Sequence, residues 1–260
     1  LYAEGALQPV IVVAIDMPPD RMAAYGVFDR ASGLARVAHT RHGAVGTHAD
    51  AYARWLVEAV LPAVEARYRT LPGPEGRSLL GWSLGGTSAF AIAWQYPELF
   101  GRVGALSPAF WLAADGHDAA SAQATRLVQG LVDGSAPGPR PKVFIGVGSA
   151  EETDDRDGDG VIDVVDDARE LVDGWQRPDG TVQRGLRQLG LRAHHAPASR
   201  RTRDPVALFE LPGGRHDQAS WARMLPVFLC WAHATPAGAR RPAECIPADA
   251  SAEGAQTGMH

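Results

Sequence analysis

Ser78-Leu-Leu-Gly-Trp-Ser-Leu-Gly-Gly-Thr-Ser-Ala-Phe90 is the most informative part of this sequence. Ser78–Gly81 is typical of a short apolar strand, and the small residues of Leu84–Tyr96 are typical of a helix. The turn between them matches the pattern G-x-S-x-G of a nucleophile elbow, which exposes a serine hydroxyl at the edge of a sheet. The pattern predicts Ser83 as a nucleophile and the backbone N–H of Leu84 as an oxyanion donor. Glycine is expected two positions to either side, because side chains there would collide with neighbouring backbone.

Short apolar runs alternate with longer amphipathic stretches along the rest of the chain. Pro9–Asp16 is a continuous β-branched run, typical of a strand that is buried on both faces. Further strands are predicted at Val103–Leu106, Lys142–Val147 and Val206–Leu211, and helices at Ala49–Tyr68, Ala119–Val132 and Gln218–Ala232. This alternation predicts an α/β fold with a mostly parallel central sheet flanked by helices. We expect a single domain over residues 1–235, followed by a C-terminal segment over 236–260.

A serine nucleophile needs a base, and the base needs an acid that orients it. After a nucleophile elbow, the acid precedes the histidine along the chain. His216 fits the base, because it lies on a loop between the last predicted strand and the last predicted helix, where open α/β sheets place their sites. The acid is expected after the strand Lys142–Val147, where Glu151 comes first and Glu152 and Asp154 are rivals.

One short segment carries the negative charge of the protein. The whole chain has a net charge of −5, whereas residues 151–173 contain eleven acidic and two basic residues, which leaves the rest of the chain mildly basic. Within this segment, residues 155–166 match the pattern of a calcium-binding loop, with Gly160 at the sixth position, where such a loop turns sharply. The six expected ligands are Asp155, Asp157, Asp159, the carbonyl of Val161, Asp163 and Asp166.

The last ligand position holds aspartate rather than glutamate, as in dockerin-type loops, which favours millimolar calcium affinity. The sequence therefore predicts structural Ca²⁺ in an insertion over residues 151–167. We also expect this ion to order the loop that carries Glu151.

The two cysteines, Cys230 and Cys245, both lie near the C-terminus. No CxxC pattern or Cys/His cluster accompanies them, so zinc is not expected. They flank a turn that contains proline and glycine, and we expect a disulfide that ties the final segment to the preceding helix, before a flexible tail. A disulfide predicts an oxidising compartment, so the protein is expected to be periplasmic or secreted.

Composition excludes several classes of protein. With 45% hydrophobic and 21% charged residues and a slightly acidic balance, the chain is neither a disordered acidic chain nor a basic nucleic-acid binder. Its apolar runs are far shorter than the ~20 residues that a membrane span needs.

Five motifs occur in the order known from one group of esterases. They are Ala49–Arg69, GWSLGGTSAF (81–90), Tyr96–Phe100, Ser107–Trp111, and Gly213–His216 with Trp221. Over roughly Leu7 to Trp231 the chain resembles the esterase D / enterochelin esterase / feruloyl esterase group. The resemblance implies an α/β-hydrolase fold and activity on ester bonds, with Ser83 as nucleophile and His216 as base. The acid of that group lies in a glycine-x-x-acid turn, which corresponds to Glu151.

The chain departs from this group at its front. In the group, further strands and a His-Gly motif, which supplies the second oxyanion donor, precede the segment that matches Pro9–Asp16. No such motif is present here. By the group's strand order, the absent strand lies between Val10–Ile15 and the strand before Ser83. We therefore expect an N-terminal segment or a partner chain to complete the sheet.

The leading interpretation is a serine esterase that acts on a small-molecule or polysaccharide-linked ester through an acyl-enzyme. Two alternatives remain: an acyltransferase on the same scaffold, and a non-catalytic, calcium-stabilised binding module. Trp82, Phe110 and Trp111 are candidates for a substrate pocket, although aromatic residues at these spacings are also common in a core.

Overall fold

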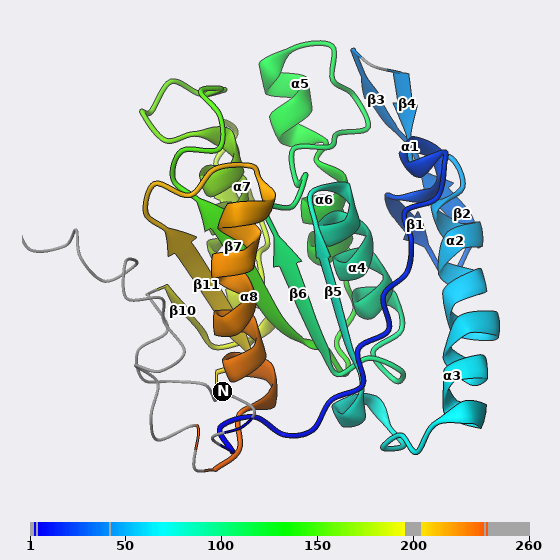
Figure 1. Ribbon diagram of the computed structural model, residues 1–260. Helices are drawn as coiled ribbons and strands as arrows, with labels where there is room; N and C mark the ends of the chain where they lie inside the picture. Colours follow the sequence, from blue (N-terminus) through cyan, green and yellow to red (C-terminus); the bar gives the residue numbers. More distant parts are fainter. Residues whose placement is uncertain (1–2, 4, 42, 196–203, 237, 239–260) are drawn as a thin grey trace, which may run out of the picture.

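The centre of the protein is a five-stranded sheet in which all neighbouring strands are parallel, seen here in a computed structural model (Figure 1). The structure describes residues 3, 5–41, 43–195, 204–236 and 238. The strand order is β10-β11-β7-β6-β5, and the bounds are β5 (Ser78–Trp82), β6 (Arg102–Leu106), β7 (Lys142–Gly148), β10 (Ala193–His195) and β11 (Val206–Leu211). Because the strands are parallel, their carboxyl ends meet at one edge of the sheet, where the loops carry the candidate residues.

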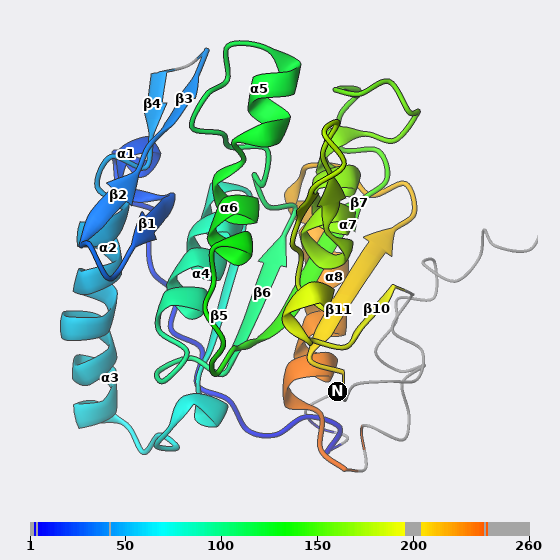
Figure 2. The same ribbon diagram turned by 180° about the vertical axis from the view of Figure 1, so that it is seen from behind.

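Helices cover both faces of the sheet. Helices α4 (Leu84–Gln95), α6 (Leu127–Asp133) and α7 (Asp163–Asp173) lie on one face, and α8 (Gln218–His233) lies on the other (Figures 1 and 2). The predicted α/β fold, a parallel central sheet flanked by helices, is confirmed.

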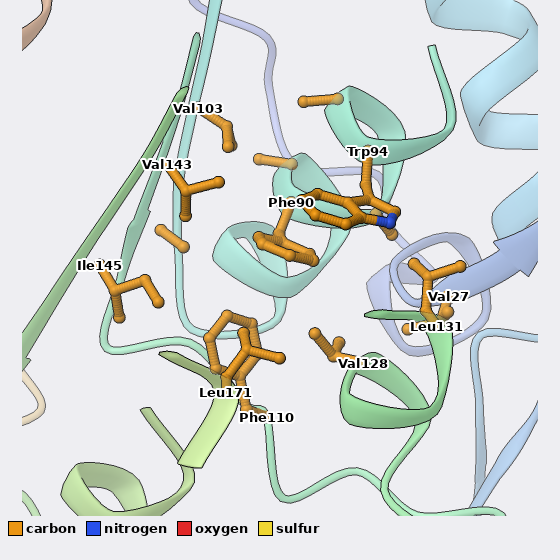
Figure 3. Close-up of a cluster of buried hydrophobic side chains, with 14 of the residues drawn as sticks. Val27, Phe90, Trp94, Val103, Phe110, Val128, Leu131, Val143, Ile145 and Leu171 are labelled. Carbon is orange, nitrogen blue, oxygen red and sulfur yellow. The ribbon is translucent and has the colours of Figure 1, made fainter. Parts of the chain in front are cut away.

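The larger core lies between α4 and the sheet. Phe90 and Trp94 of α4 stack with ring centroids 5.4 Å apart and belong to one buried cluster with Val103, Val143 and Ile145 of the strands (Figure 3). A second cluster fills the face under α8. It contains Leu106, Phe144, Phe209, Met224, Phe228 and Trp231.

The N-terminal part forms small elements around one long helix. The predicted helix Ala49–Tyr68 is present as α2 (Ala49–Trp55), a π-helical turn (Leu56–Val60) and α3 (Leu61–Arg67). The smaller elements of this part are α1 (Arg21–Ala24), the hairpins β1 (Val27–Asp29)–β2 (Leu34–Arg36) and β3 (Ala38–Thr40)–β4 (Gly43–Val45), and a short 3-10 turn at Pro74–Gly76. Later in the chain, between α7 and β10, lie the pair β8 (Trp175–Gln176)–β9 (Val182–Gln183) and a 3-10 turn at Arg187–Leu189.

The helix expected over Ala119–Val132 is broken into α5 (Ala119–Ala124) and α6. At the break, the backbone of Arg126 leaves the helical conformation, with ψ 126°. Its guanidinium lies in the interior, where it pairs with the carboxylates of Asp167 and Glu170 on α7. A buried guanidinium without such partners would be strongly unfavourable, so these ion pairs hold Arg126 in place.

The strand expected over Pro9–Asp16 is not formed. The segment is extended but joins no sheet, and Val12 is 81% exposed. The segment has no strand beside it to pair with. In the described part of the chain, β5 forms one edge of the sheet, and Val10–Val13 pair neither with it nor with another strand. The strand before Ser83 is therefore only half-buried along its length.

The described residues contain no helix long and apolar enough to cross a membrane. Cys230 is buried in α8, whereas Cys245 and the tail that follows it lie outside the described residues. The disulfide therefore stays a prediction.

Candidate active site

Ser83 lies in a sharp turn between β5 and α4. Its backbone has φ 55° and ψ −132°, and its N–H donates to the carbonyl of Leu106 on the neighbouring strand at 2.9 Å. Positive φ in a residue other than glycine is strained and is held only by its surroundings. The turn has the backbone conformation that the sequence pattern predicts.

The expected crowding beside the elbow is confirmed on one side and wrong on the other. A Cβ at Gly81 would lie 2.2 Å from the carbonyl oxygen of Gly85, so no side chain fits there. A Cβ at Gly85 would meet only a ring carbon of Tyr25, at 3.9 Å. The second tight position is Gly86, where a Cβ would lie 3.1 Å from the Gly81 carbonyl oxygen, because the start of α4 packs directly against β5.

His216 and Glu151 extend from Ser83 in one continuous chain of hydrogen bonds. His216 Nε2 lies 3.1 Å from Ser83 Oγ, and His216 Nδ1 lies 2.9 Å from Glu151 Oε2. A carboxylate only accepts hydrogen bonds, so we assign the imidazole proton to Nδ1, which leaves Nε2 free to accept the serine proton. The structure thus brings together three residues that lie far apart in the sequence.

Glu151 is held by two further donors on its other oxygen. Its side chain is 1% exposed, and Oε1 accepts from the backbone N–H of Gly148 at 2.5 Å and from Ser107 Oγ at 2.6 Å. Ser107 itself accepts from the indole N–H of Trp221 at 2.8 Å. Sequence reasoning did not assign a role to Ser107 or Trp221. The available signal was a polar residue directly after a buried strand, which was Ser107 after β6.

The rival acids lie elsewhere. The Glu152 carboxylate accepts the backbone N–H of Val164 at 2.7 Å, in the first turn of α7, and does not hydrogen bond to His216. The carbonyl of Asp154 accepts the N–H of Asp163 at 2.9 Å. Of the three acids that the sequence left open, only Glu151 contacts the imidazole.

The environment of His216 favours its protonated form. The hydrogen bond that His216 donates to Glu151 raises the pKa of His216 above its usual value, partial burial opposes this, and the charges of Glu151, Glu152 and Asp217 add to the increase. The side chain of His216 is 42% exposed, which leaves a reacting group access to the ring.

The start of α4 provides a candidate site for developing negative charge. Leu84 is the first residue of that helix, and the first N–H groups of a helix have no partner within it. They carry the positive end of the helix dipole, directly beside Ser83.

Of the three candidate pocket residues, two are accessible. Trp82 is 50% exposed and stacks on Trp221 with ring centroids 5.7 Å apart, and Trp111 is also exposed. Phe110 is instead a core residue, packed edge-on against Phe90 at 5.6 Å (Figure 3). A ligand would reach Trp82 and Trp111 but not Phe110, which corrects that part of the expectation.

The acidic loop gathers three of the expected calcium ligands. Carboxylate oxygens of Asp155, Asp157 and Asp159 all lie within 4.8 Å of one another, and all three residues are exposed. Asp155 also accepts the N–H groups of Gly158 and Gly160, whose φ values of 75° and 89° form the turn expected at this point. Oxygen donors at this spacing fit a hard cation such as Ca²⁺.

The other expected ligands have other surroundings. Asp163 accepts the backbone N–H of Arg156 at 2.8 Å. Burial raises the pKa of Asp166 to about 7, and the nearby charges of Glu170, Asp157, Asp159 and Asp167 contribute. Four acidic residues thus crowd Asp166, a negative environment that a bound cation would relieve.

The chain is 28% identical, over 151 residues, to a protein of Bacillus subtilis (strain 168) described as "Uncharacterized protein YbbA". This match covers 58% of this chain and 53% of that protein. The structure is similar to the enterochelin esterase of Shigella flexneri, with 17% identity, a TM-score of 0.49, and coverage of 71% of this chain and 37% of that one. It is also similar to a CE1 ferulic acid esterase of the anaerobic fungus Anaeromyces mucronatus, with 19% identity, a TM-score of 0.39, and coverage of 69% and 52%. The chain spans about half the length of these proteins or less.

Residues 1–184 match the model of the family described as "Putative esterase". The matched range is more than half of the chain and contains Ser83 and Glu151. The chain therefore belongs to this esterase family.

Proposed function

We propose that the protein is a serine esterase, in which Ser83 is the nucleophile, His216 the general base and Glu151 the acid that orients it. The observation that carries this proposal is the unbroken chain of hydrogen bonds from Ser83 Oγ through both ring nitrogens of His216 to Glu151. The family membership independently favours chemistry on ester bonds.

The geometry supports a two-step reaction. Ser83 Oγ attacks the ester carbonyl carbon while its proton passes to His216 Nε2, and the N–H of Leu84 stabilises the resulting oxyanion. The intermediate collapses, the C–O bond to the alcohol breaks, and His216 returns the proton to the leaving oxygen. Water then repeats the sequence on the acyl-enzyme, which releases the carboxylic acid and restores Ser83.

The substrate class that we propose is a small-molecule or polysaccharide-linked ester. The two exposed indoles, Trp82 beside the nucleophile and Trp111 after β6, support an apolar or aromatic group in the substrate.

Hydrolysis of a panel of p-nitrophenyl esters by the wild type, Ser83→Ala and His216→Ala tests this function. We expect turnover by the wild type alone, with losses on the order of 10³-fold or more in the variants. Equal turnover by all three proteins would overturn the proposal. A wild type that releases p-nitrophenol only when an alcohol acceptor is added would instead favour the acyltransferase. A properly folded wild type without any turnover would favour the binding module.

We further propose that Asp155, Asp157 and Asp159, with the carbonyl of Val161, Asp163 and Asp166, hold a structural Ca²⁺. The contacts of Glu152 with α7 and of Arg156 with Asp163 support a link from this loop to the acid, because they join the start of the loop, next to Glu151, to that helix.

Thermal unfolding in buffer with about 5 mM CaCl₂ and in buffer with EDTA tests whether the protein binds calcium. We expect a higher melting temperature with calcium, and loss of that difference in Asp157→Asn/Asp159→Asn. An equal melting temperature of the wild type in both buffers would contradict the site.

A periplasmic or secreted location and a disulfide between Cys230 and Cys245 remain proposals as well. Titration of thiols in denaturant is expected to find none without reductant, whereas two reactive thiols would contradict the disulfide.

Finally, we propose that one further strand, from an N-terminal segment or a partner chain, pairs with the open edge of β5. The half-buried state of β5 and the exposed run Val10–Val13 support this. Hydrogen exchange tests it at the N–H groups of β5 that point away from β6. Slow exchange at these groups requires such a partner, and fast exchange would contradict it.

A further inference from the structure

Ser107 follows β6 in an unusual backbone conformation. Among the described residues other than glycine, only Ser83 and Ser107 have positive φ, at 55° and 44°. The two follow neighbouring parallel strands, β5 and β6, and therefore lie at the same edge of the sheet. Strained residues of this kind persist where the surroundings fix them, and they gather at functional sites.

The hydrogen bonds of Ser107 have a fixed direction. The indole N–H of Trp221 only donates, and it reaches Ser107 Oγ at 2.8 Å. The hydroxyl has a single proton, and Glu151 Oε1 lies 2.6 Å away as an acceptor. Because Ser107 is fully buried, water does not offer another acceptor. The proton of Ser107 is therefore directed to Glu151.

We propose that Ser107 and Trp221 are positioning residues of the esterase reaction, which hold Glu151 by a one-way chain of hydrogen bonds so that its other oxygen faces His216. This inference rests on the proposed function of Ser83, His216 and Glu151. Trp221 contributes twice, because its ring also packs edge-on against His216 with centroids 5.3 Å apart.

The chain of hydrogen bonds has a consequence for pH dependence. Glu151 contacts His216, while Glu152 and Asp217 act on it through their charge, and Trp221 packs against the ring. A donor on Glu151 favours the more negative state of the pair, in which His216 is neutral and competent as a base. Removal of the Ser107 hydroxyl therefore raises the pH at which His216 loses its proton.

The test measures the profile of kcat/KM from about pH 5 to pH 9 for the wild type, Ser107→Ala, Ser107→Gly and Trp221→Phe. Ser135→Ala is the matched control, because Ser135 accepts the indole N–H of Trp94 at 2.9 Å, outside this site. The Ala and Gly variants both remove the hydroxyl, but only glycine relieves the strain of positive φ.

We expect the acid limb of both Ser107 variants to move up by about 0.5–1 pH unit, and that of Trp221→Phe to move up by less. Ser135→Ala keeps the wild-type limb. An acid limb that stays at the wild-type pH in both Ser107 variants overturns the inference. A shift in Ser107→Ala but not in Ser107→Gly also overturns it, because such a difference would indicate backbone strain rather than the lost hydroxyl. Fluorophosphonate labelling separates failure of this inference from failure of the proposed function. Labelling of the wild type that is absent in Ser83→Ala shows an active nucleophile, whether or not Ser107 has a positioning role.

Discussion

Replacement of Glu151 by glutamine leaves the shape of the site nearly unchanged and reverses one hydrogen bond. Oε1 of Glu151 receives two donors, the N–H of Gly148 and the hydroxyl of Ser107, so the amide oxygen of the glutamine takes this position. Its NH₂ group then faces His216 Nδ1. The imidazole must accept there and carry its proton on Nε2, toward Ser83, where it no longer acts as a base.

The expected loss in kcat/KM is on the order of 10³–10⁴-fold, because the wrong tautomer removes the general base while the fold and the helix terminus remain. The assay is hydrolysis of p-nitrophenyl acetate at pH 8, with circular dichroism as a check of folding. Glu152→Gln is the matched control, since its amide oxygen still accepts the N–H of Val164. A Glu151→Gln enzyme within tenfold of wild type, or an equal loss in Glu152→Gln, would refute the assignment of the acid.

Three more outcomes follow from the structure. Asp167→Asn breaks a buried ion pair in which each side chain is 1% exposed. This change should lower the free energy of unfolding by about 3–5 kcal/mol and Tm, measured by calorimetry, by roughly 10 °C. Glu98→Gln, which breaks an exposed ion pair, should change Tm by under about 3 °C, and equal shifts in the two variants would contradict the effect of burial. Gly81→Ala places a Cβ 2.2 Å from backbone and should destabilise the fold by at least about 1–3 kcal/mol in urea unfolding, whereas Gly85→Ala should not; the reverse order would count against the elbow geometry. The pKa of His216 is raised above its usual value of 6.5. Because activity needs the neutral ring, the acid limb of kcat/KM should lie above pH 6.5, and a limb at or below that pH would contradict the hydrogen bond from His216 to Glu151. The stability that this pair contributes is complete below pH 6.5 and is lost as the pH rises through the raised pKa.

The sequence predicts the sheet well where periodicity and burial agree. β6, β7, β11 and α8 are found close to their predicted bounds, because each buries a continuous apolar face. Pro9–Asp16 has an equally strong strand pattern, yet it forms no strand. A strand needs a partner for its backbone, and no local pattern reports whether a neighbour is present.

The candidate site shows the same division. Ser83 follows from a local motif, and His216 from its position after a strand. The choice of Glu151 over Glu152 depends on which way each side chain points from one loop, which adjacent acidic residues do not reveal. The role of Ser107 depends on a positive φ and on contact with Trp221, 114 residues away in the chain, so only the tertiary structure brings it to view.

Mass spectrometry of the intact protein after treatment with a fluorophosphonate tests whether Ser83 is an activated nucleophile. We expect one covalent adduct on the wild type, located on the peptide that contains Ser83, slower labelling in His216→Ala, and no adduct in Ser83→Ala. An unlabelled wild type, or an adduct that persists in Ser83→Ala, would show that Ser83 is not this nucleophile.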